Sequence, residues 1–565
     1  MKAFVVRHDR PVFSAQKCSD SAEAEAQLAH YEEASAKVDE DIHAMMKKAS
    51  NSDEVTILEA QSFMLKDPDF TSRIRHLILD DYYNAPMAVE TAAGQIIDQL
   101  SKLGSQMFRE NIYDVQDIAS RLISTLTKEK FTNIKELEEK VIVVADTILP
   151  SELLAMDVSM IGAICLDGGG STSHVAILAR SMNIPAVFAL KDASSRIESG
   201  GLAAVDGLSG ILYIDPDEKT VRRIKREKRQ LEEEERLLKE DAVLPAITKD
   251  GVRIRLECNI DGIDHVESSL KNGAEGAGLL RTEFLLMTEG KTYSEDEQAE
   301  IYAQLASAFS RRGPVTIRTY DVGGDKVVSD LHVDEDNPVL GWRAVRFCMS
   351  RRDIFRTQLR AVLRASGSCP GRIRLMFPMI SGPDELDDVL SFFESVKAEC
   401  RSEGIVFDED MKTGTMIEVP SAAITSDILA SKVDFFSVGT NDLTQYTIAV
   451  DRGNEKISYL YKEYDVAMLR LLKYTSDSAA AHELDLSMCG ELASDIEFIP
   501  LIIGLGFRKL SMHPASLLSA RRLIRSLNYS DCQVLAKKAL DMTSCRDIEE
   551  LVEKFNAEIR DNQQG

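Results

Sequence analysis

One histidine of the sequence, His174, stands directly behind a loop of three glycines and three hydroxyl residues, G-G-G-S-T-S. The apolar run I-G-A-I-C-L-D precedes this loop, and V-A-I-L-A-R, which has helical spacing, follows the histidine. Glycines allow a ligand to approach the backbone, and the N–H groups at a helix start receive phosphate well. The loop lacks the G-K-[ST] of a P-loop. Two interpretations stay open on these residues: His174 accepts a phosphoryl group on a ring nitrogen, or it only packs at a helix start.

A second set of candidate residues stands where short apolar runs end in the carboxyl-terminal half of the chain. A single surface arginine or glutamate is more often a salt-bridged surface residue, but several such side chains at successive strand ends favour one shared site. The set combines guanidiniums, carboxylates, an amide and a thiol: Arg281, Arg318, Glu418, Asn441, Asp442 and Cys489.

The side-chain types of this set suit phosphoryl transfer. Guanidinium groups bind phosphate and carboxylate in a bidentate manner, and Arg452, one loop beyond Asp442, could add a third cationic contact. Glu418 and Asp442 could hold Mg²⁺, which prefers few carboxylates together with substrate oxygens. A metal there would neutralise charge that develops during the transfer. The carboxylates that suit a metal therefore lie in this set and not beside His174.

Cys489 lies in the run M-C-G-E and is the unusual member of the set. A thiol with an ordinary pKa near ~8.5 is mostly protonated at neutral pH, so Cys489 could donate a proton as well as act as a nucleophile. The other interpretation is a small buried apolar side chain, because free cysteine is usually buried.

Eight apolar runs over about 300 residues, each followed by a helical stretch, predict the elements that position this set. Eight βα units of this size are typical of a TIM (β/α)8 barrel, in which the chemistry lies where strands end. The runs are R-I-R-L-E-C-N-I, A-G-L-L, V-T-I-R-T, I-R-L-M-F-P, G-T-M-I-E, F-F-S-V-G, D-L-S-M-C-G and K-L-S-M.

The chain ahead of the barrel has a different texture. Residues 19–139 are rich in Ala, Glu, Gln, Leu and Lys with helical spacing, which predicts a helical bundle. Apolar runs with glycine turns follow from Val141 and predict a compact α/β domain, which the opening strand K-A-F-V-V is expected to join. The bundle would then be an insertion into that domain.

The sequence therefore predicts a multidomain α/β protein in four parts. The α/β domain comprises residues 1–18 and 140–217, the inserted helical bundle 19–139, a charged helical linker 218–245, and the barrel 246–565. In the linker, four glutamates follow a basic block and cancel its field, so the pattern favours a solvated helix over a nucleic-acid-binding surface.

Composition argues against several classes of function. A net charge of −26 over 565 residues argues against non-specific nucleic-acid binding and against anionic membrane surfaces. No apolar run reaches membrane-spanning length. The nine cysteines form no C-x-x-C pair, which disfavours a thiolate zinc site and favours free thiols in a reducing compartment. The sequence thus predicts a cytoplasmic protein without nucleic-acid partners or membrane insertion.

Long ordered motifs over nearly the whole chain resemble those of Enzyme I, the phosphoenolpyruvate–protein phosphotransferase of the bacterial sugar phosphotransferase system. They are G-G-S-T-S-H-V-A-I-L-A-R, G-A-E-G-A-G-L-L-R-T-E-F-L, I-R-T-Y-D-V-G-G-D-K, N-P-V-L-G-W-R, F-F-S-V-G-T-N-D-L-T-Q-Y-T-I-A-V-D-R-G-N and M-C-G-E-L-A. The length and order of these motifs make the resemblance specific.

The resemblance implies a role for each candidate residue. His174 would be the phosphohistidine, phosphorylated on Nε2, and Cys489 would protonate the enolate to pyruvate. Glu418 and Asp442 would hold Mg²⁺, and Asn441 would contact the phosphoryl group. The residues expected to bind phosphoenolpyruvate are Arg281, Arg318, Asn441, Asp442, Arg452, Lys326 and Arg343.

The resemblance also implies partners and a motion. The inserted bundle would dock the small phosphocarrier protein HPr, a histidine of which receives the phosphoryl group from His174, and the barrel would form a homodimer. Since His174 and the barrel residues lie in separate predicted domains, the histidine domain must swing between the barrel and HPr, with residues 222–238 as the expected pivot.

Three features depart from the family pattern. Relatives usually begin with an extra strand and an A-S-P-G-like turn, so either translation starts upstream or the α/β domain lacks an edge strand. Many relatives carry a threonine near the position of Leu153 that orients the phosphohistidine ring, a role for which leucine has no hydrogen-bonding group. The segment Y-L-Y-K-E-Y-D-V-A lacks the usual prolines but contains none of the assigned residues.

Two other functions compete with this one. A pyruvate phosphate dikinase or phosphoenolpyruvate synthase shares the histidine domain and the barrel, but it needs a nucleotide-binding domain that the bundle of about 120 residues is too short to supply. A non-enzymatic scaffold that binds HPr is weakened by the complete set of candidate residues from His174 to Cys489.

Overall fold

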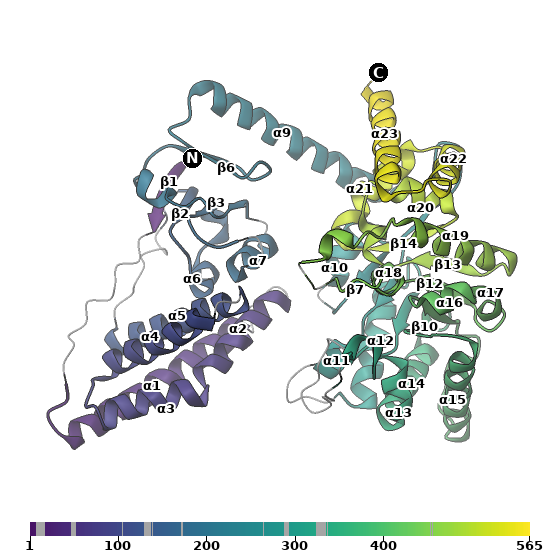
Figure 1. Ribbon diagram of the computed structural model, residues 1–565. Helices are drawn as coiled ribbons and strands as arrows, with labels where there is room; N and C mark the ends of the chain where they lie inside the picture. The colour runs from purple at the N-terminus through teal and green to yellow at the C-terminus, as the bar shows by residue number, and fades with distance from the viewer. Residues whose placement is uncertain are drawn as a thin grey trace. The chain divides into compact units, whose positions relative to one another are not determined.

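The computed structural model folds as two compact units, Met1–Glu232 and Glu233–Gly565. Figure 1 shows the helices and strands of both units. The residues that the structure describes are 1–6, 17–46, 52–103, 106–128, 137, 139–170, 173–182, 184–263, 265–287, 293–323, 335, 337–452, 454 and 456–564.

The second unit is a closed barrel of eight parallel strands in sequence order, which confirms the predicted TIM-barrel class (Figure 1). Every predicted apolar run forms one of its strands. The strands are β7 (Arg255–Ile260), β8 (Ala277–Leu280), β9 (Val315–Arg318), β10 (Ile373–Phe377), β11 (Thr413–Ile417), β12 (Phe435–Val438), β13 (Asp485–Met488) and β14 (Lys509–Met512). The barrel closes where β14 pairs with β7, Lys509 opposite Arg255.

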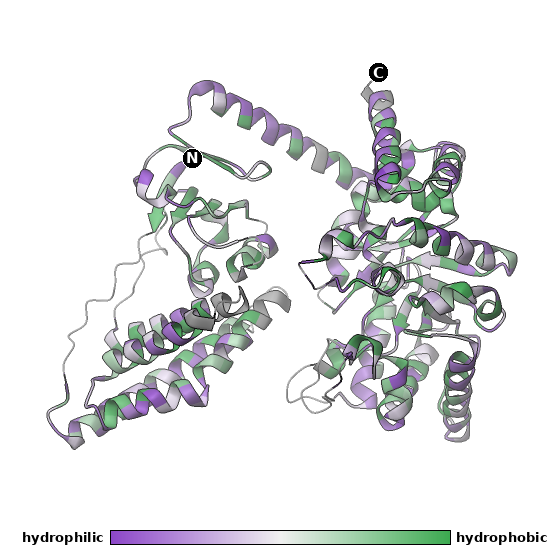
Figure 2. Cartoon of the chain, in the orientation of Figure 1, coloured by the Kyte–Doolittle hydropathy of each residue, from purple (hydrophilic) through white to green (hydrophobic). Residues whose placement is uncertain are grey.

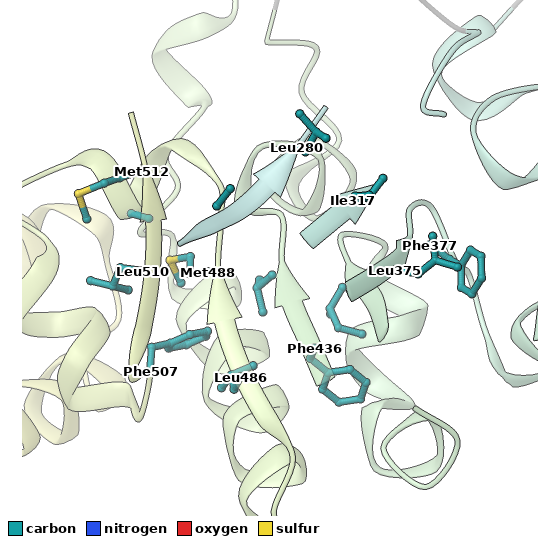
Figure 3. Packing of buried hydrophobic residues seen from close by; sticks show 14 of the residues in the cluster. Leu280, Ile317, Leu375, Phe377, Phe436, Leu486, Met488, Phe507, Leu510 and Met512 are labelled. Atoms are coloured by element: carbon teal, nitrogen blue, oxygen red, sulfur yellow. The ribbon is translucent and has the colours of Figure 1, made fainter. Parts of the chain in front are cut away.

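The period of two along each strand divides the side chains between two faces. Ile317, Leu375, Phe377 and Phe436 belong to the large core against the helices (Figure 3). Residues that directly precede or follow members of this core along the chain form a separate small cluster of buried side chains, which we assign to the barrel interior: Leu279, Met376, Met416, Phe435 and Cys489. A polar residue at a strand end therefore faces the interior when its neighbour faces the helices.

Helices and short 3-10 turns follow the barrel strands. The helices are α10 (His265–Lys271), α11 (Phe284–Met287), α12 (Glu295–Ala308), α13 (Val345–Ser350), α14 (Arg352–Ser368), α15 (Pro383–Ser402), α16 (Pro420–Ile424), α17 (Ser426–Leu429), α18 (Thr440–Ile448), α19 (Val466–Ala481), α20 (Ile499–Leu505), α21 (Leu517–Ser526), α22 (Tyr529–Leu540) and α23 (Cys545–Gln564). The turns are η3 (Pro338–Leu340), η4 (Ser458–Leu460), η5 (Glu491–Ser494) and η6 (Pro514–Ser516).

The first unit contains a four-stranded sheet in the order β1-β2-β3-β4. Its strands are β1 (Lys2–Val6), β2 (Val141–Ala145), β3 (Ile161–Leu166) and β4 (Ala186–Val187), accompanied by α6 (Pro150–Ala155), η1 (Val158–Met160), α7 (His174–Ser181) and α8 (Ala193–Arg196). The opening strand joins this sheet in parallel with β2 over five residue pairs. A hairpin of β5 (Ala203–Asp206) and β6 (Ile211–Ile214) follows.

The outer edge of β1 is covered by the chain just before and at the start of that hairpin. The N–H of Ala3 donates to the carbonyl of Gly201 at 2.8 Å, and the N–H of Ala203 donates to the carbonyl of Met1 at 2.8 Å. The backbone groups along this edge therefore have partners within the unit, which blunts the tendency of a sheet edge to pair with other chains.

Five helices lie between β1 and β2 in the sequence and pack as a bundle (Figure 1). They are α1 (Ser21–Met46), α2 (Ser52–Leu65), α3 (Pro68–Leu79), α4 (Ala85–Leu103) and α5 (Gln106–Thr127). Tyr31, Phe70, Ile74 and Leu122 are buried in its core. The predicted helical insertion into the α/β sheet is thus how this unit is connected.

A buried polar contact joins the bundle to the α/β sheet. Asp117 of α5, which is fully buried, accepts hydrogen bonds from the Ser151 hydroxyl at 2.5 Å and from the Ser151 N–H at 3.1 Å, and Gln61 donates to it at 2.7 Å. Ser151 lies in the first turn of α6, so an acceptor on the bundle satisfies a free N–H of that helix start.

The helix α9 (Glu218–Asp241) spans the boundary between the two units. Hydrophilic residues cover most of it (Figure 2). Oppositely charged side chains pair one turn apart along its length, as Arg222 does with Glu218 and Arg236 with Glu240. Pairs of this spacing favour the helical conformation slightly, because solvent screens charges that are so exposed. Among the helices described, none is long and apolar enough to cross a membrane.

Candidate active site

Arg318 ends β9 inside the barrel and is only 5% exposed. Its guanidinium donates to Glu283 at 2.5 Å and pairs with Asp321 at 3.2 Å. Burial alone would lower the pKa of Arg318, but the charges of these two carboxylates raise it above its ordinary value. Its Nε has no hydrogen-bond partner among the described residues. The side chain is therefore a fixed cation that keeps one donor unused.

Arg343 connects two carboxylates below the barrel rim. Its Nε and one terminal nitrogen donate to Asp321 at 2.8 and 3.0 Å, and both terminal nitrogens donate to Asp442 at 3.0 and 3.2 Å. A further bond reaches the Tyr446 hydroxyl at 3.2 Å. All five N–H groups of the guanidinium are thereby used. In this arrangement Arg343 orients Asp442, which lies in the first turn of α18.

Glu418 follows β11 and is 1% exposed. It accepts the N–H of Met379 at 2.6 Å. Burial, together with the charges of Asp442 and Asp321, raises the pKa of Glu418 well above its ordinary value, although Arg318 and Arg343 act in the opposite direction. Burial is the largest of these causes, and the two neighbouring carboxylates add to it.

The donors at this site suit a divalent cation. The carboxyl groups of Glu418 and Asp442 are both buried and lie near enough to each other for the charge of Asp442 to raise the pKa of Glu418. No group of three or more His, Cys, Asp or Glu arranged to hold a metal occurs in the part of the chain that the structure describes. Two carboxylates completed by substrate oxygens and water match the habit of Mg²⁺. The donor set therefore fits Mg²⁺.

Cys489 follows β13 and is 3% exposed in the barrel interior. Its thiol lies 3.6 Å from the carbonyl of Val438, and its backbone carbonyl accepts from Asn259 at 3.0 Å. The pKa of Cys489 is raised to about 11. Burial is the main cause and the nearby charge of Glu418 adds to it, whereas Ser437, Arg318 and Arg281 lower the pKa. The thiol is protonated at neutral pH, so it can give up a proton.

Three predicted residues lie at the more exposed rim of the barrel. Arg281 follows β8 and pairs with Asp261 at 3.0 Å, both about half exposed. Asn441 lies in the first turn of α18 beside Asp442, and Arg452 follows that helix on the surface. Lys326 lies outside the described residues, so its predicted role stays a prediction.

His174 lies in the first unit, at the first position of α7, apart from the barrel set along the chain. The N-cap of this helix is Ser173, whose hydroxyl accepts the N–H of Ala176 at 3.3 Å and donates to the carbonyl of Gly170 at 2.9 Å. The glycine loop is held at its other end by Asp167, which accepts the N–H groups of Ala193 and Ser194. The predicted helix start at His174 is confirmed.

A small cavity lies beside this helix start. Its lining includes the hydroxyl residues Tyr113, Thr147 and Ser173; the other lining residues are Ile148, Pro150, Leu166, Gly168, Gly169 and Val175. Leu153, for which the family pattern has a hydroxyl, is instead fully buried in the apolar cluster that also holds Val175 and Leu178. Leu153 is therefore a packing residue in this chain.

The structure adds acidic residues that the motifs did not single out. Asp321 and Glu283 are buried and bind the guanidiniums of the site, and Glu491 binds Asn441. Glu283 follows the predicted Arg281 in the run R-T-E, and Asp321 follows the predicted Arg318 in the run R-T-Y-D. An acidic residue so close to an arginine at a strand end is the signal that could have identified both.

Three family models match the chain. The PEP-binding domain of the PEP-utilising enzymes matches residues 235–529, their mobile domain matches 137–210, and their N-terminal domain matches 2–111. The first of these models covers most of the barrel, and the second contains His174.

Relatives with names match over almost the whole chain. A phosphoenolpyruvate-protein phosphotransferase of Haemophilus influenzae is 36% identical over 558 residues, which is 98% of this chain and 96% of the relative. The protein of the same name from Priestia megaterium is 36% identical over 555 residues, again 98% and 96% of the two chains. A solution structure of an Enzyme I protein is 31% identical and covers 41% of this chain and 94% of its own, with a TM-score of 0.34.

Proposed function

The chain belongs to the phosphoenolpyruvate-protein phosphotransferases, a family of PEP-utilising enzymes, and on that premise we propose its reaction in residue detail. The phosphoryl group of phosphoenolpyruvate passes to His174 with release of pyruvate, and then to a histidine of the phosphocarrier protein HPr. This is the first step of sugar uptake by the phosphotransferase system.

The observation that carries this proposal is the buried charge arrangement at the barrel rim. Arg318 is a fixed cation with an unused Nε donor, and Arg343 holds Asp442 near the buried carboxyl group of Glu418. Phosphoenolpyruvate carries a phosphate and a carboxylate, and their anionic oxygens can accept a hydrogen bond from the guanidinium of Arg318. Arg281 and Arg452 at the exposed rim, together with Lys326, are proposed as the further cationic contacts to phosphoenolpyruvate.

We propose Glu418 and Asp442 as the residues that hold Mg²⁺. Bound there, the ion would supply charge neutralisation for the phosphate oxygens of the substrate. The chain contributes the geometry: the Met379 N–H fixes one oxygen of Glu418 at 2.6 Å, and Arg343 fixes both oxygens of Asp442. Carboxylates oriented in this way lose little further freedom when they bind an ion.

The chemical step breaks the bond between phosphorus and the enol oxygen and forms a bond between phosphorus and Nε2 of His174. The electron pair left on the enolate is taken up when its methylene carbon accepts the proton of the Cys489 thiol, which gives pyruvate and a thiolate. The thiolate regains its proton from water, as expected for a thiol with a pKa of about 11. Asn441 is proposed to donate a hydrogen bond to the phosphoryl group.

The predicted parts of the chain then have separate tasks. Residues 1–18 and 140–217 carry the phosphohistidine, 19–139 dock HPr, 218–245 form the linker, and 246–565 bind phosphoenolpyruvate and form the homodimer. His174 must reach the barrel rim and HPr in turn, so the proposed cycle requires the first unit to move relative to the second. The protein is proposed to act in the cytoplasm.

Labelling with ³²P-phosphoenolpyruvate tests this function directly. With Mg²⁺ the wild type should take up acid-labile label, as a phosphohistidine does, and should pass it to added HPr. A His174→Ala protein should take up none, and His265→Ala, a histidine of the barrel unit, serves as the matched control that labels normally. Equal labelling of His174→Ala would refute the assignment, and labelling by ATP would favour the dikinase function instead.

A further inference from the structure

Asn441 is held by a two-point contact with one residue of the next barrel loop. The Nδ2 group of Asn441 donates to the Glu491 carboxylate at 2.8 Å, and the N–H of Glu491 donates to Oδ1 of Asn441 at 2.8 Å. The two residues are 50 positions apart in the sequence and belong to α18 and η5. This pair of bonds is called the Asn441 clamp below.

The chemistry of the partners fixes which way the carboxamide points. A backbone N–H can only donate and a carboxylate can only accept, so oxygen and nitrogen of the amide are assigned without ambiguity. One N–H of Nδ2 is used by Glu491, and the other has no partner among the residues that the structure describes. The clamp thus leaves one oriented donor at the barrel rim.

Contacts with the loop between η4 and α19 hold the α18 side of the clamp. The hydroxyl of Thr440, which precedes Asn441, donates to Glu463 at 2.6 Å, and the Tyr461 hydroxyl donates to the Asn441 carbonyl at 2.9 Å. A Cβ at Gly490 would lie 2.5 Å from the Thr440 nitrogen, so only glycine allows the loop of Glu491 to come this close. The backbone on the α18 side of the clamp is therefore held by two further contacts, and the loop of Glu491 lies close against it.

We propose that Glu491 is a positioning residue for phosphoryl transfer: it holds the Asn441 carboxamide so that its second N–H is presented to the phosphoryl group of the substrate. This inference rests on the function proposed above and adds to it a residue that does not itself touch the substrate. Glu491 is exposed, so its charge stays hydrated and the clamp needs no buried partner. Its loss should affect the rate of transfer more than the binding of substrate.

Single-turnover labelling of the full-length protein at varied phosphoenolpyruvate concentration measures the maximal labelling rate and the half-saturating concentration. Glu491→Ala removes one charge-assisted bond of the clamp, so the maximal labelling rate should fall about tenfold while the half-saturating concentration changes less than about threefold. Glu491→Gln keeps an acceptor oxygen for Nδ2 and should restore the rate to within about threefold of wild type. Glu497→Ala, an exposed glutamate of the same loop region that pairs only loosely with Arg560 at 3.7 Å, is the matched control and should leave the rate unchanged.

A double-mutant cycle decides whether Glu491 acts through Asn441. On an Asn441→Ala background, Glu491→Ala should have no further effect, because the group that it orients is gone. An equal tenfold loss on that background, or no loss in Glu491→Ala alone, would overturn the inference. Melting temperatures of all variants within about 2 °C of wild type would show that the rates do not report unfolding.

The same measurements separate this inference from the proposed function. If the wild type takes up no label from phosphoenolpyruvate, the function itself is wrong. If His174 is labelled normally in both Asn441→Ala and Glu491→Ala, the function stands and the Asn441 clamp has no part in it.

Discussion

Burial keeps the thiol of Cys489 protonated at neutral pH, so that the side chain has a proton to donate. Because its pKa is raised to about 11, the thiol keeps its proton across the neutral range. The sequence left two interpretations of Cys489 open, a proton donor and an inert buried cysteine. The structure is compatible with both, because the side chain is buried but lies close to Glu418, Arg318 and Arg281. Only a measurement of rate distinguishes the two.

Replacing Cys489 should therefore slow the reaction without weakening substrate binding. Cys489→Ala is expected to lower the rate of pyruvate formation by about 10²-fold or more, the usual contribution of a positioned general acid. The affinity for phosphoenolpyruvate, measured by calorimetric titration with Mg²⁺, should change less than about threefold. Cys258→Ala, another fully buried barrel thiol, is the matched control. A loss of affinity in Cys489→Ala with little change in rate would point to a structural thiol.

Residues at strand ends could be predicted because position alone determines where they point. Arg318 and Glu418 follow from the period of two and from the end of an apolar run. Glu491 could not be predicted in the same way, because its partner Asn441 lies 50 positions away in the sequence. Such pairs arise when the barrel closes and bring distant loops together.

At the scale of elements, α18 and η5 both contact the carboxyl group of Glu463, through Thr440 and the backbone of Leu492. Glu463 accepts from Thr440, and burial raises the pKa of Glu463 to about 7, with the charge of Glu491 adding to the rise. An unfolded glutamate has a pKa near ~4.3. Between these two values the folded protein holds a proton that the unfolded chain has released, so ionisation of Glu463 destabilises the fold as the pH rises toward 7.

Glu463→Gln should remove this dependence on pH. Relative to wild type, the free energy of unfolding of the variant is expected to increase by about 2 kcal/mol between pH 5 and pH 8, since the amide cannot ionise and still accepts the Thr440 bond. Urea unfolding at the two pH values measures the difference. Glu497→Gln, on the exposed surface, should show no such change. A difference between wild type and Glu463→Gln that is the same at both pH values would contradict the assignment.

The helix α6 is tied to α7 by packing through Leu153. Because Leu153 is fully buried, Leu153→Ala should lower the free energy of unfolding of the first unit by about 2–4 kcal/mol. Leu153→Met keeps the volume and should cost less than about 1.5 kcal/mol with labelling of His174 unchanged. Leu208→Ala, at a side chain that is 85% exposed, is the neutral control. Lost labelling in a stable Leu153→Met protein would show that this position does more than pack.

The sequence predicted the strand β4 but not its length. The run I-P-A-V-F-A-L predicted a full strand, but β4 comprises only Ala186–Val187. The backbone turns left-handed shortly afterwards, with φ of 60° at Ala189 and 72° at Lys191. Positive φ at residues with a side chain is set by the surrounding fold, which apolar patterning does not report.

The whole molecule is two compact units joined through one helix, and only the second contains the residues proposed to bind phosphoenolpyruvate. The units are therefore expected to unfold in separate transitions. In calorimetry of the full-length His174→Ala protein, which cannot be phosphorylated at that position, phosphoenolpyruvate with Mg²⁺ should raise the melting temperature of the barrel alone. A shift of both transitions together would show that substrate binding couples the units.

The pairing of β1 with β2 bears on how the polypeptide is made. The first strand leaves the ribosome early but has no partner until Val141–Ala145 has been synthesised. The entropy of closing so long a loop grows only with the logarithm of its length, and a bundle that folds in the meantime shortens the distance between the two strands. The bundle is therefore expected to form first on the nascent chain, and the sheet that presents His174 can assemble only after it.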